Sequence, residues 1–117
     1  TYAAIRYVDV RNNAKIDILG VKPETIQKYG AVSKNTAIEM AENMRKISNT
    51  DIGISSTGIA GPSGGSEEKP VGLVYVAMAT KDGVECKELR LWGERTRIRN
   101  VTCLHAMDMV RRYLLKL

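Results

Sequence analysis

The sequence lacks several features that mark particular classes of protein. It has no Phe, one Trp, one His and two Cys among its 117 residues. No stretch approaches the roughly 18–20 consecutive apolar residues that a membrane-spanning helix requires. The N-terminus shows no basic region followed by an apolar run, so we find no signal peptide. These absences argue against a membrane or secreted protein, and we expect an intracellular, cytoplasmic location.

The few cysteine and histidine side chains do not form a metal-binding pattern. Cys86 and Cys103 are far apart and show no CxxC spacing, and His105 is the only histidine. A structural zinc site needs about four such ligands at characteristic spacings, so we expect neither a metal nor another cofactor. In a reducing compartment the two cysteines are expected to be free thiols, with a disulfide as the alternative.

The net charge of +5 permits nucleic-acid binding but supports it only weakly. The positive side chains are scattered, apart from Arg90 and the group Arg95, Arg97 and Arg99. With 5% aromatic residues the sequence does not predict a base-stacking platform for nucleic acid. Arginines beside a glycine-rich loop suit a small phosphate-bearing ligand equally well. We therefore expect a small-molecule partner and no nucleic acid, with charge-driven nucleic-acid binding as the weaker alternative.

The first half of the chain predicts a strand followed by two helices. Residues 3–10 alternate loosely, as in a strand that ends at a polar turn. Pro23 is well suited to the first position of a short helix that Gly30 would end. Ser33 is a good N-cap for a longer helix. Apolar residues recur there at helical spacing, namely Ala37, Met40, Ala41, Met44 and Ile47.

The second half predicts strands and a long final helix. Residues 51–56 and the strongly apolar residues 73–79 are typical of strands, and a tight turn at 81–83 leads into a hairpin partner over 84–92. The final helix carries one apolar face, formed by Ile98, Val101, Leu104, Met107, Val110, Leu114 and Leu117. Together these elements predict an α/β fold, a single three-layer α/β/α domain over residues 1–117 with a mixed sheet.

The most unusual segment is the loop over residues 57–72, TGIAGPSGGSEEKPVG. Its glycines allow backbone N–H groups to approach an anion without obstruction by Cβ atoms. It is not a Walker A loop, which ends in Gly-Lys-Ser/Thr, and it does not lead directly into a helix as a GxGxxG loop does. The alternative is a flexible surface loop, where glycine and serine also gather.

The order of residues in this loop resembles the signature of the CinA C-terminal family. The likeness lies in residues 57–62, 64–65 and 68–72, and continues in residues 19–21 and 29–33 and in residues 93–95 and 98–99. The family includes the PncC-type amidases. The resemblance therefore implies hydrolysis of the carboxamide of nicotinamide mononucleotide (NMN) to nicotinate mononucleotide and ammonia. It also implies a metal-independent mechanism, a serine nucleophile activated by a lysine, an arginine that anchors the phosphate, and a homo-oligomer.

The family's motifs carry over to this chain unevenly. The Tyr-Ser-Asn-x-x-Lys motif falls on residues 10–15, where Asn12 and Lys15 match but Val10 and Arg11 do not. The resemblance makes Lys15 the candidate base and Arg95 the second candidate catalytic residue. It places substrate binding on Asn12, Thr57, Gly58, Ala60, Gly61, Gly64, Gly65 and Lys69.

Each candidate has a plainer alternative. Lys15 could be a solvated surface lysine, and Arg95 could simply begin the last helix. A cation is poorly placed there relative to the helix dipole, which favours a ligand role for Arg95. The family's Glu-Ser-x-Thr-Gly-Gly motif, which supplies the serine, belongs before Thr1. We therefore expect the chain to lack the family's first strand and helix. A catalytically degenerate nucleotide-binding module is the alternative that Val10 favours.

Overall fold

The structure, a computed structural model, describes residues 20–59, 61–62 and 64–116. The predicted strand over residues 3–10 lies outside these described residues. The elements in chain order are α2 (Pro23–Tyr29), α3 (Lys34–Ser48), β1 (Gly53–Gly58), β2 (Leu73–Thr80), β3 (Gly83–Arg90) and α4 (Arg95–Leu115). The two early helices, the hairpin and the long last helix are therefore confirmed, although β3 ends two residues before the predicted Trp92.

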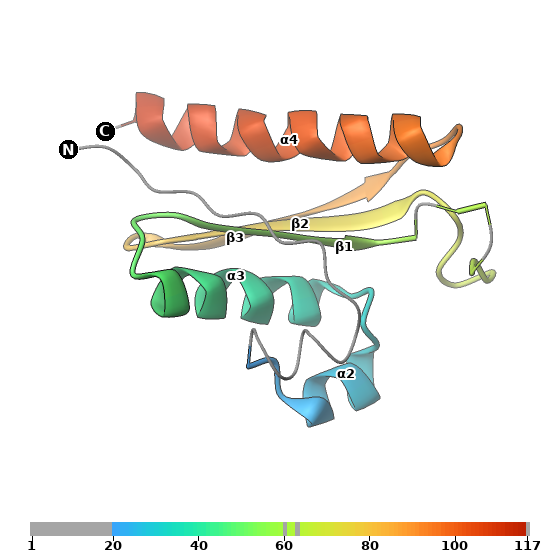
Figure 1. The fold of residues 1–117 in the computed structure, drawn as a ribbon, viewed down its shortest axis with the longest axis horizontal. Coiled ribbons are helices and arrows are strands. Elements are labelled where there is room, and N and C mark those ends of the chain that lie inside the picture. The colour runs from blue at the N-terminus through green and yellow to red at the C-terminus, as the bar shows by residue number, and fades with distance from the viewer. Residues whose placement is uncertain (1–19, 60, 63, 117) are drawn as a thin grey trace.

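The described strands form a sheet in the order β1-β2-β3. Both pairs are antiparallel, with Ser55 opposite Ala77 and Tyr75 opposite Glu88. The described part of the sheet is thus antiparallel; the predicted mixed sheet also counted residues 3–10. Helix α4 covers one face of the sheet and α3 the other, with α2 beside α3 (Figure 1). The predicted three-layer α/β/α arrangement is confirmed.

Two groups of buried side chains join the helices to the sheet. On one face, Ala37 and Ala41 of α3 pack against Ala77 and Ala79 of β2. These small side chains allow a close approach of helix and sheet. The larger cluster on the other face holds α4 in place. It contains Ile52, Ile54, Val74, Val76, Met78, Leu89, Ile98, Ala106, Met109 and Val110.

The predicted apolar face of α4 is wrong in part. Leu104 and Met107 are 64% and 68% exposed, whereas Thr102 and Ala106 are buried. Apolar residues lie on two sides of this helix, so their spacing gives the helical period without saying which side meets the sheet. Thr102 is tolerated in the interior because its hydroxyl donates to Ile98 O at 2.7 Å. Helical spacing is ambiguous in α3 as well, where Ile47, predicted on the apolar face, is 57% exposed.

The corner between α2 and α3 is built from local hydrogen bonds. Helix α2 begins at Pro23 and its last turn closes at Gly30, whose N–H donates to Ile26 O at 2.8 Å. Ser33 caps α3, because its hydroxyl oxygen accepts from Thr36 N at 3.1 Å. The Thr36 hydroxyl in turn donates to Gly30 O at 2.7 Å. The predicted cap is confirmed, and it also holds the two helices together.

Replacing Ser33 with alanine is expected to lower the free energy of unfolding by about 1–2 kcal/mol, because the Thr36 N–H loses its acceptor at a buried helix start. Urea denaturation followed by circular dichroism measures the change. Lys34→Ala, at the exposed neighbouring position, is the control and is expected to stay within about 0.5 kcal/mol of the parent chain. Equal effects of the two substitutions would contradict the capping role.

Candidate functional site

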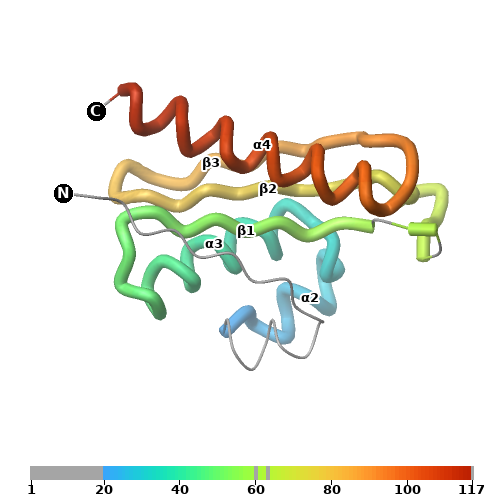
Figure 2. The backbone as a smooth tube through the Cα atoms, turned by 45° about the horizontal axis from the view of Figure 1, so that its top comes forward, coloured from blue at the N-terminus to red at the C-terminus, as the bar shows by residue number. Residues whose placement is uncertain are grey.

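The loop over residues 57–72, called the glycine loop below, leaves β1 and returns into β2 at one end of the sheet. It lies beside the first residues of α4 (Figures 1 and 2). Backbone hydrogen bonds continue the ladder past the strand ends. Ile59 N donates to Leu73 O at 3.0 Å and Gly72 N donates to Ile59 O at 2.7 Å. Leu91 N donates to Gly72 O at 2.8 Å, which attaches the segment after β3. The base of the loop is therefore held by paired backbone groups.

Arg95 lies against this loop. It is the first residue of α4, it is exposed, and its Nη1 lies 3.5 Å from Gly61 O in a long hydrogen bond. In the described part of the chain no carboxylate forms an ion pair with it. The first turn of α4 contains no acidic residue, and Glu94 gives no side-chain cap. A guanidinium at a helix start without a paired anion is electrostatically unfavourable, so an anionic ligand there would relieve the repulsion.

Thr57 and Lys69 connect the loop to the α2–α3 corner. The Lys69 ammonium donates to Tyr29 O at 2.7 Å, and the Thr57 hydroxyl donates to Ala31 O at 2.7 Å. The sequence predicts both as substrate contacts, and that assignment stays a prediction. These two bonds anchor the loop, and Arg95 is a further cation beside the loop backbone.

The loop glycines differ in what they do. Gly58 pairs with Val74 at the end of the β1–β2 ladder. Gly61 has φ +81°, and a Cβ there would lie 2.6 Å from Val71 Cγ1, so only glycine lets this backbone pack against Val71. Gly64 and Gly65 are exposed at the tip, and their amides have no hydrogen-bond partner within the described residues. These two amides are candidate donors for an anion.

Three predicted site residues, Asn12, Lys15 and Ala60, lie outside the described residues. The assignment of Lys15 as a base and of Asn12 and Ala60 as substrate contacts therefore stays a prediction. The described residues bring Arg95, Gly61 and the Gly64–Gly65 tip to the same end of the molecule.

Sequence reasoning did not single out Trp92, which is held beside this site. The Arg97 guanidinium carbon lies 3.8 Å from the centroid of the Trp92 ring, and Arg97 Nη1 donates to Trp92 O at 2.6 Å. The indole is nevertheless 72% exposed. The sequence does offer one indication of a role for Trp92, because it is the chain's only tryptophan and stands directly before Gly93 and the arginine group.

The ionisable groups with raised pKa values lie elsewhere. Tyr75 and Cys86 pack against the alanine cluster between α3 and the sheet. Burial raises the pKa of the Cys86 thiol, and burial followed by the hydrogen bond to Glu88 raises the pKa of Tyr75. Both shifts keep the groups neutral near pH 7, so neither is activated as a nucleophile or base. Among the described residues there is no group of three or more potential metal ligands and no helix able to cross a bilayer.

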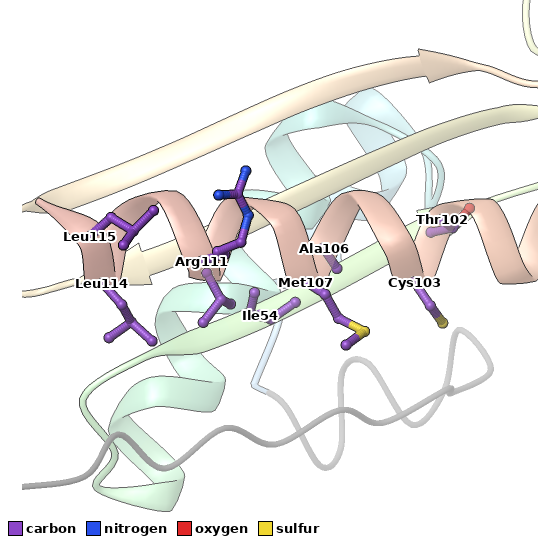
Figure 3. Close-up of a pocket in the computed structure, with 9 residues that line it drawn as sticks. Ile54, Thr102, Cys103, Ala106, Met107, Arg111, Leu114 and Leu115 are labelled. Carbon is purple, nitrogen blue, oxygen red and sulfur yellow. The ribbon is translucent and has the colours of Figure 1, made fainter.

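A separate apolar groove runs along α4, away from the glycine loop. It has a volume of about 670 Å³ and lies between α4 and Ile54 of β1 (Figure 3). Met107 and Leu114 project from the same side of the helix in Figure 3, and Leu115 also lines the groove. Arg111 is the charged residue in its lining, and its guanidinium pairs with Asp108 at 2.8 Å. The groove provides a mainly hydrophobic surface, with the exposed thiol of Cys103 in its lining.

Comparison with known proteins points to one family. The sequence model described as CinA C-terminal domain matches residues 3–114. A protein of Acetivibrio thermocellus, named as a competence-damage inducible protein, is 66% identical over 110 residues, which cover 94% of this chain and 27% of that protein. A CinA-like protein of Kosmotoga olearia is 55% identical over 106 residues, covering 91% of this chain and 26% of the relative. The chain thus spans about a quarter of the length of these curated relatives.

Solved structures agree in fold. The competence/damage inducible protein CihA from Agrobacterium tumefaciens is 45% identical with a TM-score of 0.83, covering 87% of this chain and 63% of the other. The competence damage-inducible protein A from Klebsiella pneumoniae is 28% identical with a TM-score of 0.84, covering 90% and 65%. The similarity therefore extends through both helical layers and the sheet described above.

Proposed function

This chain belongs to the CinA C-terminal domain family, and from that membership we propose that it is the nucleotide-binding part of a nicotinamide-nucleotide amidase. The reaction adds water across the carboxamide C–N bond of NMN and yields nicotinate mononucleotide and ammonia. The observation that carries the proposal is the contact of Arg95 with the backbone of the glycine loop at Gly61. This contact supports the proposal because the same loop carries the exposed residues Gly64 and Gly65.

In this proposal Arg95 and the amides of Gly64 and Gly65 hold the 5′-phosphate of NMN. A guanidinium offers several N–H donors in a planar arrangement that matches phosphate oxygens. Binding energy from the phosphate, which does not react, can be used to orient the carboxamide at the reacting centre. The anchoring of the loop through Lys69 and Thr57 supports this role, because a held loop loses little entropy when the ligand binds.

Lys15 is the proposed base, carried over from the family's Tyr-Ser-Asn-x-x-Lys motif. The family's serine nucleophile lies in a Glu-Ser-x-Thr-Gly-Gly motif that does not occur in these 117 residues. We therefore place the nucleophile in polypeptide beyond them. A lysine of lowered pKa next to a serine can remove the hydroxyl proton, and backbone N–H groups can stabilise the oxyanion that forms.

The test compares two proteins, the 117-residue chain alone and the same chain joined at its N-terminus to a segment that contains the family's Glu-Ser-x-Thr-Gly-Gly motif. Calorimetry with NMN measures binding, and an ammonia assay measures turnover. We expect both proteins to bind NMN and only the joined protein to release ammonia. Replacing the added serine with alanine is the control that separates turnover from binding. Failure of both proteins to bind NMN would reject the proposal.

A catalytically degenerate nucleotide-binding module is the second candidate. Val10 and Arg11 stand where the family's motif has tyrosine and serine, which favours loss of turnover with binding retained. In the same experiment this candidate is supported if the joined protein binds NMN but releases no ammonia above the level of the serine-to-alanine control.

A further inference from the structure

We propose that Trp92 stacks against the base of the mononucleotide whose phosphate is held by Arg95. This inference rests on the proposed nucleotide site and adds a specificity-determining residue to it. Tryptophan side chains are rarely left this exposed, and an ordered exposed indole is typical of a binding surface. At 72% exposure Trp92 buries little of its ring against the protein itself.

The indole is exposed but held in place. Arg97 covers one ring face at 3.8 Å from the centroid and donates to the Trp92 carbonyl at 2.6 Å. Gly93 between them has φ +104°, and a Cβ there would lie 2.8 Å from Arg97 Cδ. A side chain at position 93 would thus push Arg97 off the ring. The glycine, the hydrogen bond and the cation–π contact together orient Trp92 and leave its opposite face for a ligand.

The position of Trp92 relative to the loop suits one ligand that reaches both. Leu91, the preceding residue, is hydrogen-bonded to Gly72 at one end of the glycine loop, and Arg95 contacts Gly61 near the other end. Segment 91–95 therefore borders the loop. Arg95 is the third residue after Trp92, so their Cα atoms are at most about 11 Å apart. A mononucleotide, with a flat base at one end and a phosphate at the other, can bridge the two side chains.

The surroundings of Trp92 favour a nucleotide over a protein or nucleic-acid strand. The residues that follow it are Gly93, Glu94 and Arg95, and Arg97 covers its ring, so cationic side chains suited to a phosphate-bearing ligand lie close to it. A single-stranded nucleic acid is usually held by successive stacking aromatics, and aromatic residues make up only 5% of this chain, one tryptophan and five tyrosines. For NMN the match is closer still, since its base is a cationic pyridinium that an indole face attracts.

Trp92 is the only tryptophan, so fluorescence excited selectively at tryptophan, without the five tyrosines, reports this site alone. We expect NMN to quench it in a saturable way and ribose 5-phosphate, which has no base, to leave it unchanged. By calorimetry, Trp92→Ala is expected to weaken NMN binding about tenfold and to leave the affinity for ribose 5-phosphate unchanged. Trp92→Phe keeps an aromatic face and is expected to stay within about threefold of the parent chain. Met107→Ala, exposed on the groove side of α4, is the control.

Outcomes of this experiment separate the stacking role from the amidase proposal. NMN binding and ammonia release that are unaffected by Trp92→Ala would overturn the stacking role and leave the amidase standing. Saturable quenching by NMN without ammonia release from the joined protein would support stacking and reject the amidase.

Equal losses of NMN and ribose 5-phosphate affinity would show that Trp92 only supports the local fold. Tighter, steeply salt-dependent binding of a single-stranded oligonucleotide would assign the surface to nucleic acid and overturn the inference.

Discussion

Replacing Arg95 with alanine is expected to weaken binding of both NMN and ribose 5-phosphate by about 10- to 100-fold, because one charged hydrogen-bonding partner of the phosphate is lost. The same loss is expected in kcat/KM of the joined protein, since the phosphate contact is present in the transition state as well as in the bound substrate. Calorimetry and the ammonia assay measure the two effects. Trp92→Ala, in contrast, is expected to affect NMN alone, so the two substitutions distinguish phosphate from base recognition.

Two further variants test whether the effect of Arg95→Ala comes from its donor geometry or from net charge. Arg95→Lys keeps the positive charge but loses the planar arrangement of donors, and is expected to recover only part of the affinity. Arg112→Ala removes an exposed arginine from the other end of the same helix, where it pairs with Asp108 at 2.8 Å. That control is expected to bind NMN as the parent chain does. An equal loss in Arg112→Ala would show that net charge, rather than the Arg95 contact, governs binding.

Replacing Ile98 with alanine is expected to lower the free energy of unfolding by about 2–5 kcal/mol. Ile98 is 1% exposed and packs in the cluster that joins α4 to the sheet. The loss combines reduced burial of apolar surface with the cavity that remains, and it is a large share of the roughly 5–15 kcal/mol that stabilise a domain of this size. Urea denaturation at fixed pH measures it, with the midpoint and the slope compared to the parent chain.

Leu104→Ala on the same helix is the matched control. Leu104 belongs to the apolar face predicted from spacing, yet it is 64% exposed in the structure. Its truncation is expected to change the free energy of unfolding by less than about 0.5 kcal/mol. If Leu104→Ala were the more destabilising substitution, the orientation of α4 described above would be wrong.

The starts of α2 and α3 show which structural features can be predicted from local sequence alone. Pro23, Gly30 and Ser33 act through backbone geometry and short-range hydrogen bonds, so their positions predict where α2 ends and α3 begins. The second bond of this corner, from the Thr36 hydroxyl to Gly30 O, depends on how the two helices meet. The angle between α2 and α3 is set by packing and cannot be predicted from the local sequence pattern.

The glycine loop shows the same division at the candidate site. Its residue order was sufficient to predict the family, and the likeness over residues 93–95 selected Arg95. Composition could not predict which polar groups would face a ligand. Lys69 and Thr57, which the resemblance predicts as substrate contacts, donate to backbone carbonyls 40 and 26 residues away in the chain. The sequence did not single out Trp92, because a strand pattern over residues 84–92 does not predict whether the side chain at its end is buried or exposed.

By itself the sequence determined the helical and strand periods, the turns and the family signature, since each depends on residues close together in the chain. The tertiary structure decided which side of α4 is buried, that Lys69 anchors the loop, and that Arg95 and Trp92 border it. Those outcomes depend on contacts between distant segments, where competing apolar faces and alternative polar partners are close in energy until the whole core has packed.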